Sequence, residues 1–510
     1  MTADSVPQST QRAAEPISRG AEWTFDLLRR YDDAIGECAR EFGLDTYPNQ
    51  IEVITSEQML DAYAATGLPI TYPHWTHGKE FIRNEALYRK GYQGLAYEIV
   101  INSDPCIAYL MEENTITMQA LVIAHASYGH NSFFKGNYLF RQWTYADAIL
   151  DYLVFARSYV MNCEERYGVA AVEEILDSCH ALAPHGVDKY KRPGAKSLKD
   201  EARRQTEREE SSRRLFNDLW RTLPRKEQKE AATAERPAFP AEPEENGLYF
   251  IEKYSPKLEP WQQEIVRIVR KISQYFYPQS QTKVMNEGWA CFWHYTLVNR
   301  LYDKGLVDDS FMLEFLQSHT NVIAQRGFDQ PGYGGLNPYA LGFAMFRDLR
   351  RICEEPTSED REWFPEIAGT DWRPVLDFAM RNFKDESFIA QYLSPKLIRD
   401  FRLFAIADHA DEPELIVEAI HDEAGYQRVR TLLSRQYSRD YMVPDIQVAN
   451  YERDGDRSLT LRHQMPRSRP LQEDEAEETL KHFARLWGFT VRLESVNDDG
   501  EVQSTIECTA

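Results

Sequence analysis

Apolar residues recur at every third or fourth position over most of the first 400 residues, which is the spacing of amphipathic helices. The pattern is first complete in Trp23, Leu27, Tyr31, Ile35, Cys38 and Phe42. Gly43 follows directly and predicts the helix end, because glycine adopts the left-handed conformation of a helix C-terminus at little cost. Further helices are predicted over residues 115–129, 139–167, 170–183, 261–276 and 309–319.

Two short runs rich in β-branched residues have the length of strands. They are IEVI at 51–54 and YEIVIN at 97–102. The second run precedes the helix that starts at Thr115. We therefore expect a small sheet beside that helix, inside a mainly helical domain.

The pattern changes from Phe401 onward. Strands are predicted at 401–407, 446–453, 458–463 and 490–494, and helices at 414–437 and 473–486. The order βαββαβ is that of a ferredoxin-like fold. We predict a separate C-terminal domain over residues 401–510.

Two segments have the composition of solvated chain. Residues 1–20 are polar and are expected to form a disordered tail, and residues 195–246 combine a mixed-charge run with a Pro/Ala/Glu segment. The sequence therefore predicts an α+β protein. A mainly α-helical core with a small sheet and a charged insert spans 21–400, and the ferredoxin-like domain follows it.

Composition excludes several classes of function. The 510 residues include 59 basic and 81 acidic side chains, a net charge of −22, which disfavours binding to nucleic acid or to anionic lipid. No apolar run approaches the ~20 residues that span a bilayer, and the first residues contain no signal-peptide core, so we expect a cytoplasmic protein. The seven cysteines form no CxxC pair, which argues against a zinc knuckle.

His125 and His130 are the first candidates for chemistry. They end an apolar helical run and precede a polar cluster, where imidazoles are hard to bury without partners. Their spacing, HASYGH, places the rings ~140° apart on an unbroken α-helix. The two imidazole rings can therefore converge only if the helix ends at Gly129. Unlike the H-E-x-x-H motif, this stretch has alanine at position 126, so a general base must come from elsewhere, with Glu112 or Glu113 as candidates.

A second candidate group lies in VMNEGWACFWHY at 284–295. Glu287, Cys291 and His294 share one helix face. Glu287 and His294 are ~10 Å apart along the axis, too far for both to bind one ion easily. One of the two is therefore expected to be a ligand. The other, together with Cys291, would contact the ligands without binding the ion itself.

Weaker candidates surround these two groups. His180 and His185, in CHALAPH, add two histidines near a helix end and are kept as supporting residues. The glycine-rich YGGLNP at 333–338 leads into a helix and has backbone N–H groups that suit an anion, but it lacks the Lys-Ser/Thr of a phosphate loop.

Four segments between residues 124 and 349 resemble the stage V sporulation protein R (SpoVR) family. They are HASYGHNSFFKGN, CHALAPHGVDKYKRP, KVMNEGWACFWHYTLVNRLYDKG and GGLNPYALGFAMFRDL. The resemblance implies a role in spore cortex or cell-wall formation, or in the stress response. It also implies a link to a PrkA-type serine protein kinase and a von Willebrand-type partner protein.

A looser resemblance concerns the metal. NEGWA at 286–290 is similar to the segment of gluzincin peptidases whose glutamate is the third zinc ligand, and the strand before the His125 helix matches the zincin order. By that resemblance His125, His130 and Glu287 would bind zinc or another divalent metal in a zincin-like core, with Glu113 as the base. This predicts a metal-dependent amide hydrolase. The alternative is a non-catalytic regulator or scaffold that works with the kinase.

Overall fold

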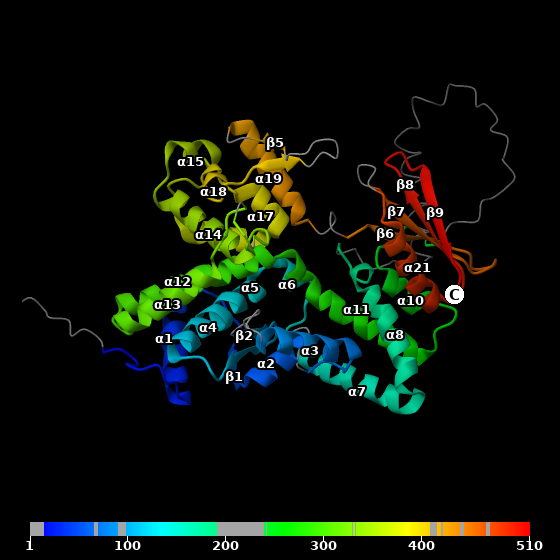
Figure 1. Ribbon diagram of the computed structural model, residues 1–510, viewed down its shortest axis with the longest axis horizontal. Helices are drawn as coiled ribbons and strands as arrows, with labels where there is room; N and C mark the ends of the chain where they lie inside the picture. Colours follow the sequence, from blue (N-terminus) through cyan, green and yellow to red (C-terminus); the bar gives the residue numbers. More distant parts are fainter. Residues whose placement is uncertain are drawn as a thin grey trace, which may run out of the picture. The chain divides into compact units, whose positions relative to one another are not determined.

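The computed structural model describes residues 15–65, 70–89, 98–190, 239–240, 242–328, 330–331, 333–407, 416–419, 422–438, 443–465 and 470–510 (Figure 1). Most of the predicted tail and insert therefore lies outside the described residues. In the described part, no helix combines the length and the apolar character needed to cross a membrane.

The chain forms two compact units. Unit 1 comprises Met1–His180 and Glu259–Pro444, and unit 2 comprises Ala181–Leu258 and Asp445–Ala510. The boundary near the C-terminus thus falls after residue 444, whereas the sequence predicted it at residue 401.

Unit 1 contains a three-stranded mixed sheet in the order β1-β3-β2, formed by β1 (Asn49–Ile54), β2 (Glu98–Ile101) and β3 (Cys106–Met111). β1 runs parallel to the central β3, and β2 pairs antiparallel at the edge. The sequence analysis missed β3, because its run CIAYLM is buried almost throughout and shows no alternation.

Helices make up the rest of the first half of unit 1. They are α1 (Phe25–Phe42), α2 (Ser56–Ala64), α3 (Trp75–Arg89), α4 (Ile116–Val122), α5 (Asn131–Gly136), α6 (Tyr138–Trp143), α7 (Ile149–Tyr167) and α8 (Val169–Ala181), with the π-helix η1 (Ile123–His130) between α4 and α5. The single helix predicted over 139–167 is interrupted between α6 and α7. The segment between α6 and α7 is hydrogen-bonded to the turn after β2. Asn102 Nδ2 donates to Thr144 Oγ1 at 2.9 Å, and the Asp104 N–H donates to the Ala146 carbonyl at 2.9 Å.

The second half of unit 1 is also helical. It comprises α11 (Pro260–Gln281), α12 (Lys283–Asp303), α13 (Asp309–Val322), α14 (Pro338–Glu354), α15 (Ser358–Trp363), α16 (Trp372–Asn382), α17 (Asp385–Tyr392), α18 (Pro395–Asp400) and α19 (Glu423–Gln436), with the short strands β4 (Ala405–Ala407) and β5 (Ile416–Ala419) before α19.

α12 is the central element of unit 1. It is buried along most of its length and packs against η1 and α14 (Figure 1). Gly288 on α12 meets Gly342 on α14 so closely that a Cβ on Gly288 would lie 2.3 Å from the Gly342 carbonyl carbon. The two glycines thus let the backbones approach at the position next to Glu287.

Unit 2 carries one four-stranded sheet in the order β6-β7-β8-β9. Its elements are η2 (Ala183–His185), α10 (Gly247–Tyr254), β6 (Ile446–Tyr451), β7 (Leu459–Gln464), α21 (Glu473–Trp487), β8 (Val491–Val496) and β9 (Val502–Cys508). β7 and β8 are parallel, and the two outer pairs are antiparallel.

The ferredoxin-like prediction is therefore wrong in its topology. The segment predicted as its first strand and helix forms β4, β5 and α19, which belong to unit 1, where the two strands pair with each other. The sequence analysis also missed β9, which completes the unit 2 sheet. The remaining elements of the prediction, from β6 to β8, are present close to their expected bounds.

Candidate metal centre

His125 and His130 lie on one face of a continuous helix. η1 follows α4 without a break and leads into α5, and its hydrogen bonds close from residue i to i+5. Residues five apart therefore take the relation that residues four apart have in an α-helix. The two imidazole rings are 4.6 Å apart, centroid to centroid. The expectation that the helix must end at Gly129 is wrong, because a widened turn achieves the convergence.

Gly129 has a different role from the one expected. A Cβ at this position would lie 2.6 Å from Ala290 Cα and 2.9 Å from Ala290 Cβ. The missing side chain lets η1 approach the backbone of α12. This contact brings the histidines of η1 next to the glutamate of α12.

Two carboxylates complete the group. Glu98 begins the edge strand β2, and Glu287 lies on α12. The Nε2 atom of His125 is 3.1 Å from Glu98 Oε1 and 3.8 Å from Glu287 Oε2, while Nε2 of His130 is 3.9 Å and 3.5 Å from the same two atoms. A tetrahedral ion with bonds of ~2.0–2.1 Å separates its ligand atoms by about 3.3 Å. The four distances bracket that value.

Both carboxylates have an oxygen atom that is buried and lacks a hydrogen-bond partner. These atoms are Oε2 of Glu98 and Oε2 of Glu287. Burying carboxylate oxygens unpaired is costly unless a cation neutralises them. The donor set of two imidazoles and two carboxylates suits zinc and related divalent ions. The two histidines and two glutamates are thus suitable ligands for a divalent metal ion.

The pKa values of the two carboxylates shift in opposite directions. Burial raises the pKa of Glu98, and the nearby His125 and His130 offset this only in part. Burial also opposes ionisation of Glu287, but His130 and His125 outweigh it and hold the pKa of Glu287 well below its usual range. Conversely, burial lowers the pKa of His130, but Glu287 and Glu98 raise it to about 9. Without a metal, a proton on His130 therefore takes the place of the cation.

Neighbouring side chains orient both imidazoles. His130 Nδ1 donates a hydrogen bond to Asn286 Oδ1 at 2.9 Å, so that Nε2 faces the carboxylates. His125 Nδ1 is 2.8 Å from His294 Nδ1, and His294 Nε2 is 2.6 Å from His319 Nδ1. When each histidine donates to the next, the lone pair of His125 is on Nε2, as a metal ligand requires.

Cys291 and His294 lie next to His125, and the possible ligand atoms of the three residues are all within 4.8 Å of one another. Both are fully buried, and burial raises the pKa of the Cys291 thiol well above its usual value and lowers that of His294 well below. Both groups are therefore neutral. His319, a further weak candidate from the sequence on the 309–319 helix, joins this group through its contact with His294.

Two further members of the site were not identified from the sequence. Glu98 was read only as a strand residue. Tyr339 lies in the first turn of α14, and burial together with its hydrogen bond to Glu287 raises the pKa of the phenol strongly. YGGLNP, read as an anion loop, is thus the segment that leads into Tyr339. Asn337 fixes its end by capping α14 and by donating to the carbonyls of Val322 and Ala324.

Three predicted residues do not join the site. Glu113 is exposed in the turn between β3 and α4, whereas Glu98 lies beside His125. His180 bonds to the Tyr72 hydroxyl through Nε2, at 2.6 Å, in a separate cluster of unit 1. His185 belongs to unit 2, where its ring lies 6.3 Å from that of Phe483. Spacing along the chain gave no information on these contacts.

Comparison with known proteins defines the relatives of the chain. Residues 22–442 match the family described as SpoVR like protein, and residues 444–498 match the SpoVR-like C-terminal domain. The chain is 60% identical over 507 residues to the uncharacterized protein YcgB of Escherichia coli (strain K12), covering 99% of this chain and 98% of that protein. No solved structure matches. The junction between the two family regions falls next to the unit boundary after residue 444, and together they show that the chain belongs to the SpoVR family.

Proposed function

We propose that His125, His130 and Glu287 hold a divalent metal ion, with zinc as the best fit, and that the protein is a metal-dependent amide hydrolase. The observation that carries the proposal is the convergence of two oriented imidazoles on the carboxylates of Glu98 and Glu287, each of which also has a buried oxygen without a hydrogen-bond partner.

Glu98 would be the general base. Its Oε1 atom lies 3.1 Å from His125 Nε2, at the edge of the ligand group and on a different element from all three ligands. A bound ion would polarise the amide carbonyl and lower the pKa of a water molecule. Glu98 would accept the proton of that water and return it to the leaving amine. It thereby fills the role of the glutamate that the histidine motif lacks.

Tyr339 would stabilise the transition state. Its hydroxyl, on α14, is hydrogen-bonded to Glu287. A phenol O–H next to the ligands is placed to donate to the oxygen that becomes negative as the amide carbonyl is attacked. The family resemblance favours an amide of the cell wall as substrate, in a cytoplasmic protein active in cortex or stress physiology.

The test separates a base from a ligand. Elemental analysis of protein purified without chelators should find one metal ion per chain. Glu98→Gln should keep the metal and lose at least about 100-fold in hydrolysis of muropeptide amides. Tyr339→Phe should keep the metal and lose about tenfold. Glu113→Gln, an exposed glutamate, is the control and should change neither. Metal-free wild-type protein would refute the proposal.

A second candidate function rests on the number of donors. If Glu98 also binds the ion, four protein ligands close the coordination sphere, as in structural zinc sites. The protein would then be a non-catalytic regulator or scaffold that docks a PrkA-type kinase or a von Willebrand-type protein. In that case Glu98→Gln would lower metal affinity, and wild type would hydrolyse no amide.

A further inference from the structure

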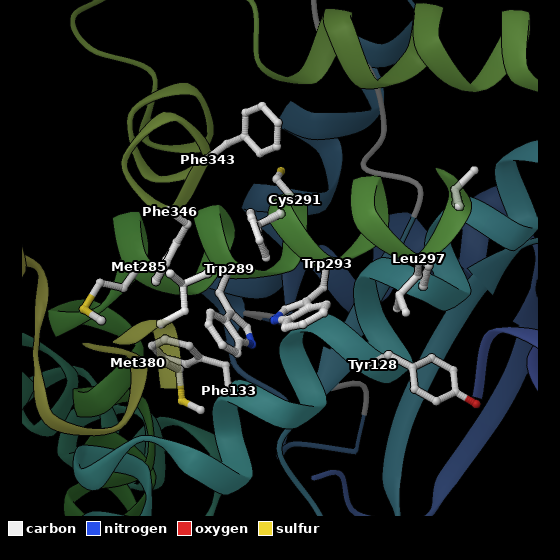
Figure 2. Close-up of a cluster of buried hydrophobic side chains, with 14 of the residues drawn as sticks. Tyr128, Phe133, Met285, Trp289, Cys291, Trp293, Leu297, Phe343, Phe346 and Met380 are labelled. Carbon is white, nitrogen blue, oxygen red and sulfur yellow. The ribbon is translucent and has the colours of Figure 1, made fainter. Parts of the chain in front are cut away.

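The two units differ in how completely they cover their own elements. In unit 1 the central helix α12 is enclosed, and Figure 2 shows Cys291 on one side of it and Trp289 and Trp293 on the other. All three side chains are buried. In unit 2, by contrast, the four-stranded sheet ends in β9, every residue of which is exposed or half-buried. The outer edge of β9 is therefore a candidate surface for contact with another chain.

The opposite edge of the same sheet is already covered. At β6, the N–H groups of Glu244 and Val448 each donate to the carbonyl of the other residue, at 2.9 Å and 2.8 Å, and the Tyr451 N–H donates to the Phe239 carbonyl at 2.7 Å. Among the described residues, no strand or bridge pairs with the outer side of β9. The backbone N–H and C=O groups that point outward from β9 are thus available to a strand of another chain.

β9 has few of the features that usually prevent pairing at a sheet edge. Its sequence, VQSTIEC, contains neither proline nor lysine. Its single charged side chain, Glu507, is paired with Arg492 on β8. The register with β8 shifts only at the first residues of β9, and pairing is regular from Ser504 to Cys508. Natural sheets protect exposed edges with prolines, charges or bulges, so an edge without them is suited to the addition of a strand.

We propose that β9 pairs antiparallel with β9 of a second copy of this chain, about a two-fold axis at Thr505. This register pairs all seven residues of β9 and places Gln503 opposite Glu507, so that an amide and not a second carboxylate faces the charge. It also places Val502, which is 52% exposed, opposite Cys508.

The covered edge at β6 limits the assembly. A two-fold contact covers the open edge of both copies at once, and no second open edge remains for a third copy to join. The result is a closed dimer with one continuous eight-stranded sheet. Because β9 belongs to unit 2, this dimer does not depend on whether the metal centre in unit 1 is occupied or catalytic.

Sedimentation equilibrium of the full-length chain tests for the dimer. The measurement covers ~1–100 µM protein in ~0.3 M salt, which screens the net charge of −22. Wild type should change from the monomer to twice the monomer mass over this range. Gln503→Glu sets two carboxylates opposite each other at two places in the dimer and should weaken association about tenfold, whereas Gln503→Lys should strengthen it about threefold.

Gln464→Glu is the matched control. Gln464 is exposed but belongs to β7, an interior strand of the same sheet. The same change of charge at this position should leave association unchanged.

Cysteine cross-linking tests the register, in a Cys508→Ser background that removes the one half-exposed thiol. Thr505→Cys should form a disulfide between copies under mild oxidation, because paired Cα atoms lie about 5 Å apart. Gln503→Cys should not, because its two copies would lie about 14 Å apart along the strands. Equal association of Gln503→Glu and Gln503→Lys, or cross-linking at Gln503 in place of Thr505, would overturn the proposal. A monomer at ~100 µM would also overturn it and leave the edge to a strand of a different protein.

Discussion

Unit 1 contains two clusters of histidines, and they differ in how their nitrogen atoms are satisfied. In the cluster beside α8, His74 contacts Thr76 Oγ1 at 2.6 Å and Asp177 Oδ1 at 3.1 Å, and His180 contacts the Tyr72 hydroxyl. In the candidate metal centre the imidazoles instead face the carboxylates of Glu98 and Glu287, each of which has a buried oxygen without a hydrogen-bond partner. Histidine density alone therefore does not distinguish the two clusters, whereas the buried carboxylates do.

The largest expected effect tests that contrast directly. Glu287→Ala should lower metal affinity by well over ~100-fold, because it removes a ligand together with the charge that attracts the ion. His74→Ala, the counterpart in the other cluster, should leave metal content unchanged. Metal content measured after dialysis against a weak chelator compares the two. Loss of metal from His74→Ala would contradict the division between the clusters.

Gly129→Ala tests whether the contact between η1 and α12 builds the site. The added Cβ would clash with the backbone of Ala290, so unfolding free energy should fall by about 2–4 kcal/mol, with loss of metal. Gly78→Ala is the control. No atom lies within 4 Å of its Cβ and Gly78 is helical, so this change should stabilise the protein by ~0.5–1 kcal/mol. Denaturant unfolding measures both variants.

His319→Ala tests the histidine chain. His319 touches no proposed ligand but orients His125 through His294, so its removal should lower metal affinity about tenfold. His319→Asn keeps a hydrogen-bonding amide at this position and should recover part of the affinity. A competition titration with a coloured chelator gives the values. Equal affinity of His319→Ala and wild type would show that the chain only fills space.

The last expected effect concerns acid stability and lies outside the candidate metal centre. Burial lowers the pKa of His180 from 6.5 to about 4, with help from His74 and His77. Between pH 6.5 and pH 4, His180 is therefore protonated in the unfolded chain but not in the folded chain. The free energy of unfolding falls as the pH drops through this range, by up to about 3 kcal/mol. His180→Gln should flatten this slope in urea unfolding curves recorded across that range. An unchanged slope would remove His180 as its source.

Part of this candidate centre was singled out from the sequence, and part of it was not. His125, His130 and Glu287 were identified because polar residues stood out on apolar helices. Glu98 and Tyr339 could not be identified in that way. Glu98 belongs to a short edge strand and Tyr339 to the start of α14, and both come near Glu287 only through tertiary packing, in which Gly288 and Gly342 let α12 and α14 approach closely.

The same reasoning explains the errors in the fold. Helical periodicity placed most helices correctly, because it reflects one buried face and needs no distant partner. The ferredoxin-like prediction failed because strand order depends on pairing between distant segments. β4 and β5 have the length and composition of strands, but they pair with each other and not with the sheet of unit 2.

The widened turn of η1 has a consequence for recognising such centres in other chains. Five residues separate the two histidines along the sequence, yet the π-helix gives them the angular relation of an i, i+4 pair. The π-helix accommodates the extra residue, and the helix is continuous from α4 through η1 to α5. Deleting one residue between Ala126 and Tyr128 would restore ordinary helical spacing while keeping both rings on one side. A search restricted to H-x-x-x-H would overlook every protein that carries the inserted residue.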